Sequence, residues 1–305
     1  MRGSVMTIET VAILSPGDMG HNYGIALDKA GFRIITCLDG RSERTKTLAK
    51  KANFEDIGNI DDLVREGDLI LSIMPPANSE GIAKEIAKAM GRTGSTPHFA
   101  DCNAISPRTS KVVGTHIINA GANYIDSGIV GPGPGTRKRP TSMYVSGPNT
   151  KAVMEINGPH IEVIDLGAEI GKASAAKMCY AAITKGSWTL YTTALVTAEA
   201  LGVSEQLHSA LKESRPGIWE DIEKMLPRLP LDAGRWIGEM EEIAETMGAA
   251  GASSHFHRGA AETMELLDST PIAEETRENY DKDRTLQQCL EIFAAHLPVK
   301  SACEN

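Results

Sequence analysis

A glycine-containing turn between an apolar run and a helical pattern is the first feature of this sequence that could do chemistry. The β-branched run Thr10–Leu14 (TVAIL) is followed at once by the turn Ser15–Gly20 (SPGDMG), and a helical pattern then continues to about Ala30, where Gly31 ends it. Such a turn lets the backbone approach a diphosphate while the first helical N–H groups point at it. The pattern predicts a dinucleotide site, although Ser15 replaces the first glycine of G-x-G-x-x-G.

The end of the second apolar run, Phe32–Leu38 (FRIITCL), bears on the choice of dinucleotide. A carboxylate there accepts a hydrogen bond from a ribose 2′-hydroxyl, whereas a cation pairs with a 2′-phosphate. The sequence offers both kinds of group, Asp39 on one side and Arg41, Ser42 and Arg44 on the other. Three donors for a phosphate favour NADP, and Asp39 leaves NAD as the alternative.

Length and composition exclude several classes of function. The chain has 305 residues, enough for about two domains of roughly 150 residues each. The net charge is −9, and no long basic run occurs, which argues against nucleic acid or an anionic membrane as a partner. Five scattered cysteines without a CxxC pair predict a reduced, cytoplasmic protein. The opening MRGS resembles a vector leader, so Met6 is the expected natural start.

The sequence pattern changes near residues 166–171. Before this point, short apolar runs alternate with amphipathic stretches, which predicts a mostly parallel, doubly wound sheet buried on both faces. After it, a helix of about 30 residues and further helical patterns follow without a strand signal. The expected fold is therefore a Rossmann-like NAD(P)-binding domain over residues 6–168 and an all-α domain over 169–305. The further strands expected are Leu69–Met74, His98–Asn103, Asn123–Ser127, Ser142–Ser146 and Ile161–Leu166.

Four segments together resemble the β-hydroxyacid dehydrogenases, whose nucleotide domain is shared with 6-phosphogluconate dehydrogenase. They are Ser15–Gly20, the IMPP at 73–76, the DSGIVGP at 126–132 and the GKASAAK at 171–177. The resemblance spans essentially residues 7–200, and the second half is similar to a divergent branch with its own helical domain. The resemblance implies that Ser15, Pro16, Gly17, Asp18, Met19, Gly20, Met74, Pro75 and Asn103 contribute to the dinucleotide site. Arg41 and Ser42 are added to this site as donors for a 2′-phosphate.

The same resemblance implies that Lys177 is the catalytic lysine and that Gly131 belongs to the substrate-binding loop. This sequence departs from the family pattern nearby. Val130 stands where the family has a serine, and Pro132 replaces the second glycine of that loop. Ala181 stands where an asparagine is usual, and Gly238-Glu239 replaces a Lys-Asp pair. We therefore expect a rebuilt substrate pocket.

Hydride transfer at an alcohol requires a group that handles the proton on the oxygen. A lysine does this when burial or a neighbouring cation brings its pKa toward neutrality. Lys185 lies eight residues after Lys177 and could lower its pKa or bind a substrate anion. We expect the helical domain to provide further hydrogen-bond donors to the substrate, with at least one arginine facing it. The candidate substrate residues there are Arg235, Glu239 and Arg258, with His255 and His257 as weaker candidates.

The hypothesis that follows is an NADP-dependent oxidoreductase acting on a hydroxy acid or its oxo form. One alternative is a reductase of neighbouring chemistry, such as imine reduction, suggested by Ala181. The other is a cofactor-binding protein without catalysis, which the presence of Lys177 disfavours. No metal site is expected, because the pair His255 and His257 lacks an evident third ligand. The long helix has apolar positions on several faces, and one small domain cannot bury them all. We therefore expect a homodimer in which a second copy of the chain buries the rest.

Overall fold

The computed structural model describes residues 8–298, so the expected leader and the start at Met6 lie outside the described residues. The chain divides into two compact units, residues 1–180 and residues 181–305, and the division falls within one long helix. Each unit is described by itself below. No helix in the described part of the chain is long and apolar enough to cross a membrane.

The first unit is built on one eight-stranded sheet with the order β3-β2-β1-β4-β5-β6-β7-β8. All neighbouring strands pair in parallel except β6 and β7, which are antiparallel. The strands are β1 (Thr10–Ile13), β2 (Arg33–Thr36), β3 (Glu55–Asp56), β4 (Leu69–Ser72), β5 (His98–Asp101), β6 (Tyr124–Val130), β7 (Thr141–Ser146) and β8 (Ile161–Asp165). The predicted mostly parallel sheet is thus confirmed.

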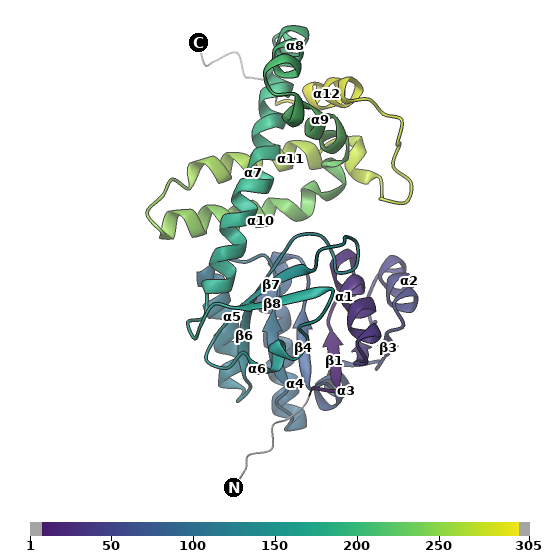
Figure 1. The fold of residues 1–305 in the computed structure, drawn as a ribbon, viewed down its shortest axis with the longest axis vertical. Helices are drawn as coiled ribbons and strands as arrows, with labels where there is room; N and C mark the ends of the chain where they lie inside the picture. The colour runs from purple at the N-terminus through teal and green to yellow at the C-terminus, as the bar shows by residue number, and fades with distance from the viewer. Residues whose placement is uncertain (1–7, 299–305) are drawn as a thin grey trace. The chain divides into compact units, whose positions relative to one another are not determined.

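Helices cover both faces of this sheet, as Figure 1 shows. They are α1 (Asp18–Lys29), α2 (Glu43–Lys51), α3 (Ile60–Glu66), the short η1 (Pro76–Asn78), α4 (Ser79–Thr93), α5 (Pro107–Asn119) and α6 (Lys151–Met154). Alternate residues of β1 enter separate cores: Val11 and Ile13 pack in one cluster, and Ala12 packs in the other. A strand buried on both faces must be apolar throughout, which is why TVAIL reads as a continuous run.

The strand order places a topological switch point at the edge where the ligands of such sheets bind. From β1 the chain moves outward to β2 and β3, and it then returns to β4 on the other side of β1. Ligands of open parallel sheets bind outside the carboxyl ends of the strands at this reversal. The turns after β1, β2, β4, β5 and β6 all lie at this edge, because these strands run parallel.

The long helix α7 (Lys172–Ala200) starts in the first unit and continues into the second. Over residues 181–298 the structure contains helices and no strand, as the sequence predicts. They are α8 (Ser204–Ser214), α9 (Pro216–Met225), η2 (Leu226–Arg228), α10 (Pro230–Ala249), α11 (His255–Asp268), η3 (Pro271–Glu274) and α12 (Leu286–Ala295). Buried side chains such as Met240, Met264 and Phe293 form the core of this unit.

Candidate functional site

The turn between β1 and α1 has the shape of a phosphate-binding turn. Gly17 is the N-cap of α1 in an extended conformation, and no side chain caps the helix there. A Cβ on Gly20 would lie 2.2 Å from the backbone oxygen of Ser15, so only glycine allows the helix to pack this close. A Cβ on Gly17 would meet nothing within 4 Å. The open space at Gly17 and the N–H groups of the first helical turn fit the diphosphate of a dinucleotide.

Two arginines, Arg41 just before α2 and Arg44 in the first turn of α2, reach toward this turn. Arg41 donates through Nη2 to the backbone oxygen of Leu14 at 3.1 Å, next to the carboxyl end of β1. Arg44 forms an ion pair with Asp18, the first residue of α1, at 2.6 Å. The Ser42 hydroxyl caps α2 by accepting a hydrogen bond from the backbone N–H of Thr45. The cationic residues that the sequence singled out therefore border the phosphate turn.

Asn103 ties the carboxyl ends of β4 and β5 together. Its side chain is almost fully buried; Oδ1 accepts from the backbone N–H of Met74 at 2.7 Å, and Nδ2 donates to Ser72 Oγ at 3.1 Å. Its own N–H donates to Asp101 Oδ1 at 2.9 Å. These bonds fix the backbone of the Met74-Pro75 turn. Asn103 is thus placed at the predicted edge, where it holds the turn that the resemblance assigns to the cofactor.

A buried carboxylate on β6 anchors the start of α7. Asp126 is inaccessible to solvent, and its two oxygens accept hydrogen bonds from β7, from α5 and from the first turn of α7. The donors are Ser110 Oγ, Ser146 Oγ, Ser174 Oγ and the backbone N–H groups of Gly171, Ala173 and Ser174. A carboxylate at a helix N-terminus satisfies N–H groups that have no partner within the helix. Asp126 therefore fixes where α7 begins against the sheet.

Lys177 lies one turn into α7, and its amine is held at the carboxyl end of β6. Its Nζ donates to the backbone oxygen of Ile129 at 2.5 Å. A Cβ on Gly128 would lie 2.7 Å from the backbone oxygen of Ala173 and 2.8 Å from the Cβ of Lys177. Only glycine at position 128 lets the helix and the lysine approach β6 this closely. Gly131 follows directly with φ of 104°, a conformation that favours glycine.

In the second unit, three of the predicted substrate residues form one cluster on α7 and α10. Lys185 contacts the carboxylate of Glu239, and its Nζ lies 4.8 Å from the centre of the Trp236 ring. Burial lowers the pKa of Lys185, and the Glu239 carboxylate opposes that shift. Arg235 forms an ion pair with Asp232 at 2.9 Å, with about half of its side chain exposed. The charge of Lys185 is thus balanced within the chain.

The remaining candidates lie on α11. Arg258 is exposed. His257 is buried, and its Nε2 lies 3.3 Å from the backbone oxygen of Ala182. A neutral imidazole in this arrangement donates through Nε2. Among residues 8–298, no group of three or more His, Cys, Asp or Glu side chains is arranged to hold a metal ion.

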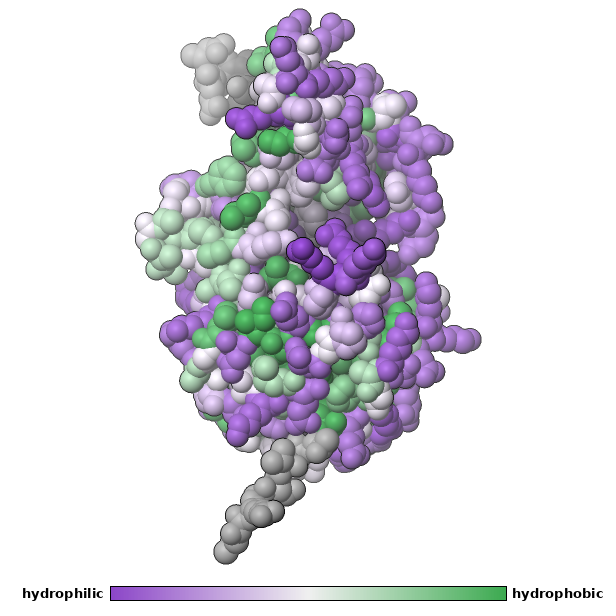
Figure 2. Space-filling model, in the orientation of Figure 1, coloured by the Kyte–Doolittle hydropathy of each residue, from purple (hydrophilic) through white to green (hydrophobic). Residues whose placement is uncertain are grey.

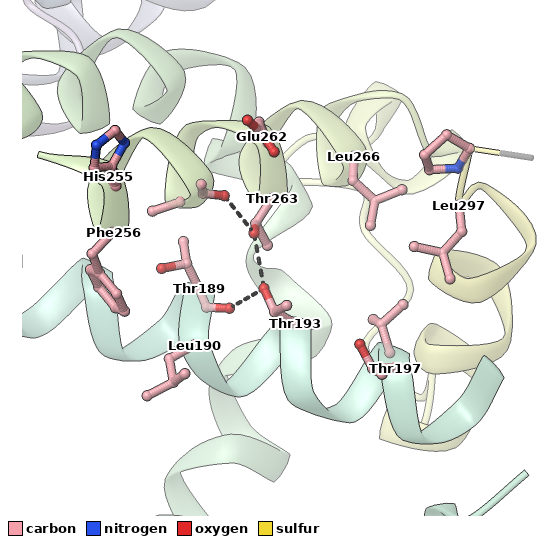
Figure 3. Close-up of a pocket in the computed structure, with 14 residues that line it drawn as sticks. Thr189, Leu190, Thr193, Thr197, His255, Phe256, Glu262, Thr263, Leu266 and Leu297 are labelled. Atoms are coloured by element: carbon pink, nitrogen blue, oxygen red, sulfur yellow. Dashed lines mark hydrogen bonds between the residues drawn. The ribbon is translucent and has the colours of Figure 1, made fainter. Parts of the chain in front are cut away.

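A groove of about 490 Å³ runs between α7 and α11 within the second unit (Figure 3). Its walls are mostly apolar, with Leu190 and Phe256 among the residues that line it. One polar contact crosses it, a hydrogen bond of 2.9 Å between the hydroxyls of Thr193 and Thr263.

Two site features have only weak sequence signals. Asp126 belongs to the DSGIVGP segment, yet nothing in that segment reveals that three serines distant in sequence converge on its carboxylate. Trp236, beside Lys185, is one of three tryptophans, and its contact with α7 becomes visible only when α10 packs on that helix.

Comparison with known proteins agrees with this geometry. Residues 10–159 match the NAD binding domain of 6-phosphogluconate dehydrogenase. An uncharacterized 28.5 kDa protein of Methanothermus fervidus is 30% identical over 191 residues, which are 62% of this chain and 71% of that protein. The chain belongs to the 6-phosphogluconate dehydrogenase-like NAD-binding family. This membership confirms the resemblance drawn from the four motifs, and the family's nucleotide domain coincides with the β1–α6 part of the first unit.

The helical half of this family member matches a domain of unknown function, DUF1932, over residues 198–267. Solved structures share the fold at low identity. A 3-hydroxyisobutyrate dehydrogenase from Salmonella typhimurium has a TM-score of 0.65 at 11% identity and covers 92% of this chain and 98% of its own. An imine reductase from Myxococcus stipitatus in complex with NADP+ has a TM-score of 0.52 at 17% identity, covering 85% and 92%.

Proposed function

We propose that this protein is an NADP-dependent oxidoreductase that transfers a hydride between nicotinamide and a hydroxy acid or its oxo form, with Lys177 as the general acid and base. The observation that carries the proposal is the position of the Lys177 amine. It is held at the carboxyl end of β6, 2.5 Å from the Ile129 oxygen, at the same edge of the sheet as the phosphate turn. Family membership supplies the nucleotide domain.

Bound nicotinamide supplies the hydride donor or acceptor. The chain supplies the proton chemistry and the positioning. In the direction of oxidation, the neutral Lys177 amine accepts the hydroxyl proton, and in reduction the ammonium returns a proton to the developing alkoxide. The Ile129 carbonyl accepts one N–H of the amine and so orients it. Asp126 fixes the start of the helix that carries Lys177, so the orientation of the lysine is maintained between catalytic cycles.

The preference for NADP is supported by the two arginines beside the turn. Arg41 and Arg44 both place guanidinium groups near the carboxyl end of β1, whereas Asp39 is exposed. A guanidinium pairs with a 2′-phosphate through two parallel hydrogen bonds, which a 2′-hydroxyl cannot match. We therefore infer that the 2′-phosphate of NADP is recognised here, with Ser42 as an additional donor.

On the substrate side, Gly131 lies in the first unit, directly after β6. We keep Arg235 and Arg258 as candidates for binding an anionic group of the substrate, because each side chain is exposed. The pairing of Lys185 with Glu239 makes Lys185 a less suitable anion ligand.

Imine reduction is the second candidate function. Ala181, which is buried, stands in place of the asparagine usual in the family, and a solved imine reductase shares the fold. A pocket without that amide loses a hydrogen-bonding group suited to a carboxylate or hydroxyl. The same lysine chemistry would then serve a nitrogen in place of an oxygen.

We also propose that the protein is a cytoplasmic homodimer. Ile183 and Leu190, both on α7, are 73% and 53% exposed, and Phe256 on α11 is 48% exposed. Large apolar side chains exposed together on two neighbouring helices favour burial against a partner. The four cysteines within residues 8–298 are free, consistent with a reducing compartment. A monomeric mass at micromolar concentration in light scattering would contradict the dimer.

A substrate panel followed by nicotinamide absorbance tests the proposal. Hydroxy acids with NADP+, oxo acids with NADPH, and cyclic imines with NADPH are assayed in parallel, each also with the non-phosphorylated cofactor. Turnover of the acids supports the first function, and turnover of imines alone supports the second. Tight cofactor binding without turnover of any class would identify a binding protein and overturn both.

A further inference from the structure

The loop between β6 and β7 carries a cationic run that the proposed chemistry does not use. It begins at Gly131, ends before Thr141, and contains Arg137, Lys138 and Arg139 in succession. All three side chains are exposed. Within residues 8–298, none of the three forms an ion pair or a hydrogen bond. The protein as a whole has a net charge of −9, so three adjacent cations without acidic partners are a marked local exception.

The base of this loop is packed against α1, one turn below the phosphate turn. A Cβ on Gly133 would lie 2.7 Å from the side-chain nitrogen of Asn22, so the loop backbone rests directly on that side chain. Asn22 in turn donates to the backbone oxygen of Asp18, the first residue of α1. In Figure 1 the loop extends from the strands toward α1.

Further contacts fix the path of the loop at both ends. Thr136 donates through its hydroxyl to the backbone oxygen of Gly133 at 2.7 Å, and Thr141 donates to that of Pro132 at 2.5 Å. Pro134 is buried. The cationic run therefore emerges from an anchored turn. Figure 2 shows strongly hydrophilic atoms gathered where Figure 1 draws this loop.

We propose that Arg137, Lys138 and Arg139 bind the diphosphate of the dinucleotide from the side opposite the N-terminus of α1. This inference rests on the proposed function, because it assumes a dinucleotide at the turn. The N–H groups of α1 satisfy phosphate oxygens from one direction only. Cations on a loop anchored one helical turn away supply countercharge from another direction, and a diphosphate carries two charges to be balanced.

The experiment compares two triple variants of the full-length chain. The first is Arg137→Gln/Lys138→Gln/Arg139→Gln. The control neutralises three exposed lysines near the C-terminal ends of α1, α2 and α4, which lie at the other edge of the sheet; it is Lys29→Gln/Lys51→Gln/Lys88→Gln. Dissociation constants for NADPH and for NADH are measured by nicotinamide fluorescence without substrate, at low and at high salt.

The loop variant is expected to bind both dinucleotides about tenfold more weakly, because exposed charge pairs each contribute a fraction of a kcal/mol. The control variant should bind within about twofold of the wild type. The difference should shrink at high salt, since exposed charges are screened. Equal losses for NADPH and NADH identify the shared diphosphate.

The inference is overturned by unchanged binding of both dinucleotides, by a loss confined to NADPH, or by a loss of the same size in the control variant. A raised KM for an anionic substrate with unchanged dinucleotide binding would also overturn it and assign the loop to the substrate. If the wild type itself binds neither dinucleotide, the proposed function fails, and this result is distinct from all the others.

Discussion

The anchoring of α7 by Asp126 makes a sharp prediction about catalysis, which two single serine substitutions can test. Ser174 and Ser110 both donate their hydroxyl to the same oxygen of Asp126, and both are fully buried. Ser174 belongs to α7, three residues before Lys177. Ser110 belongs to α5 and forms no hydrogen bond to α7 among the described residues; it shares the Asp126 carboxylate with that helix.

Removing one hydrogen bond to a charged group costs about 1.5–3 kcal/mol. Ser174→Ala should therefore destabilise the fold by about that amount. Ser110→Ala should cost at least as much, because Ser110 also lies 2.9 Å from the hydroxyl of Tyr124, which loses a buried partner. Both variants retain the other donors to Asp126 and should fold.

Their effects on turnover should differ. Small displacements of a catalytic group can reduce rates by up to about 100-fold, and Ser174→Ala loosens the turn that carries Lys177. We expect kcat to fall about tenfold in Ser174→Ala and to stay within about twofold in Ser110→Ala, with the dissociation constant for NADPH unchanged in both. Urea unfolding gives the stabilities, and steady-state kinetics gives kcat. Equal kcat losses in the two variants, or none in Ser174→Ala, would refute the positioning role.

Three further predictions concern separate parts of the molecule. Lys185→Met should lower the free energy of unfolding, measured with urea, by about 3–5 kcal/mol because the buried Glu239 carboxylate loses the Lys185 ammonium. Lys185→Met/Glu239→Leu should recover most of this loss, and equal stability of the two variants would contradict the buried pair. Arg41→Ala should weaken NADPH by on the order of 1.5–3 kcal/mol and leave NADH nearly unchanged in fluorescence titrations, and equal losses would favour Asp39 as the ribose partner. Burial lowers the pKa of His98 in the folded protein, so just below pH 6.5 the unfolded chain binds more protons than the folded protein does. The free energy of unfolding should therefore fall as the pH falls from 6.5 to the pKa of His98 in the folded protein. His98→Gln should flatten this part of the pH profile of urea unfolding, and an unchanged slope would refute the attribution to His98.

The sequence predicted the nucleotide domain well because its signals are local. A run such as TVAIL and the turn after it depend on nearest neighbours, and β1 and α1 begin and end within a few residues of the expected positions. Strand β3 (Glu55–Asp56) was not predicted, because two exposed acidic residues carry no apolar pattern. Strand β3 is recognised only by its pairing with β2 at the edge of the sheet.

The site was predicted less completely, since its parts depend on contacts between distant residues. Lys177 was found through the family motif, but its hydrogen bond to Ile129 requires the close approach that Gly128 allows. The expectation that Lys185 binds a substrate anion considered only its own helix, whereas Glu239 comes from α10. Arg235 likewise has a partner that the sequence alone did not reveal, Asp232, which lies one turn earlier on α10.

In the proposed function, the Lys177 amine, held at the carboxyl end of β6, carries the proton in the hydride transfer. The most direct test measures kcat of Lys177→Ala on the best substrate of the panel, together with the dissociation constant for NADPH. Loss of general acid–base help typically lowers rates about 10²–10⁴-fold. We expect a kcat loss in that range, with the cofactor affinity and the unfolding midpoint unchanged. A variant that turns over at near wild-type rate would contradict it.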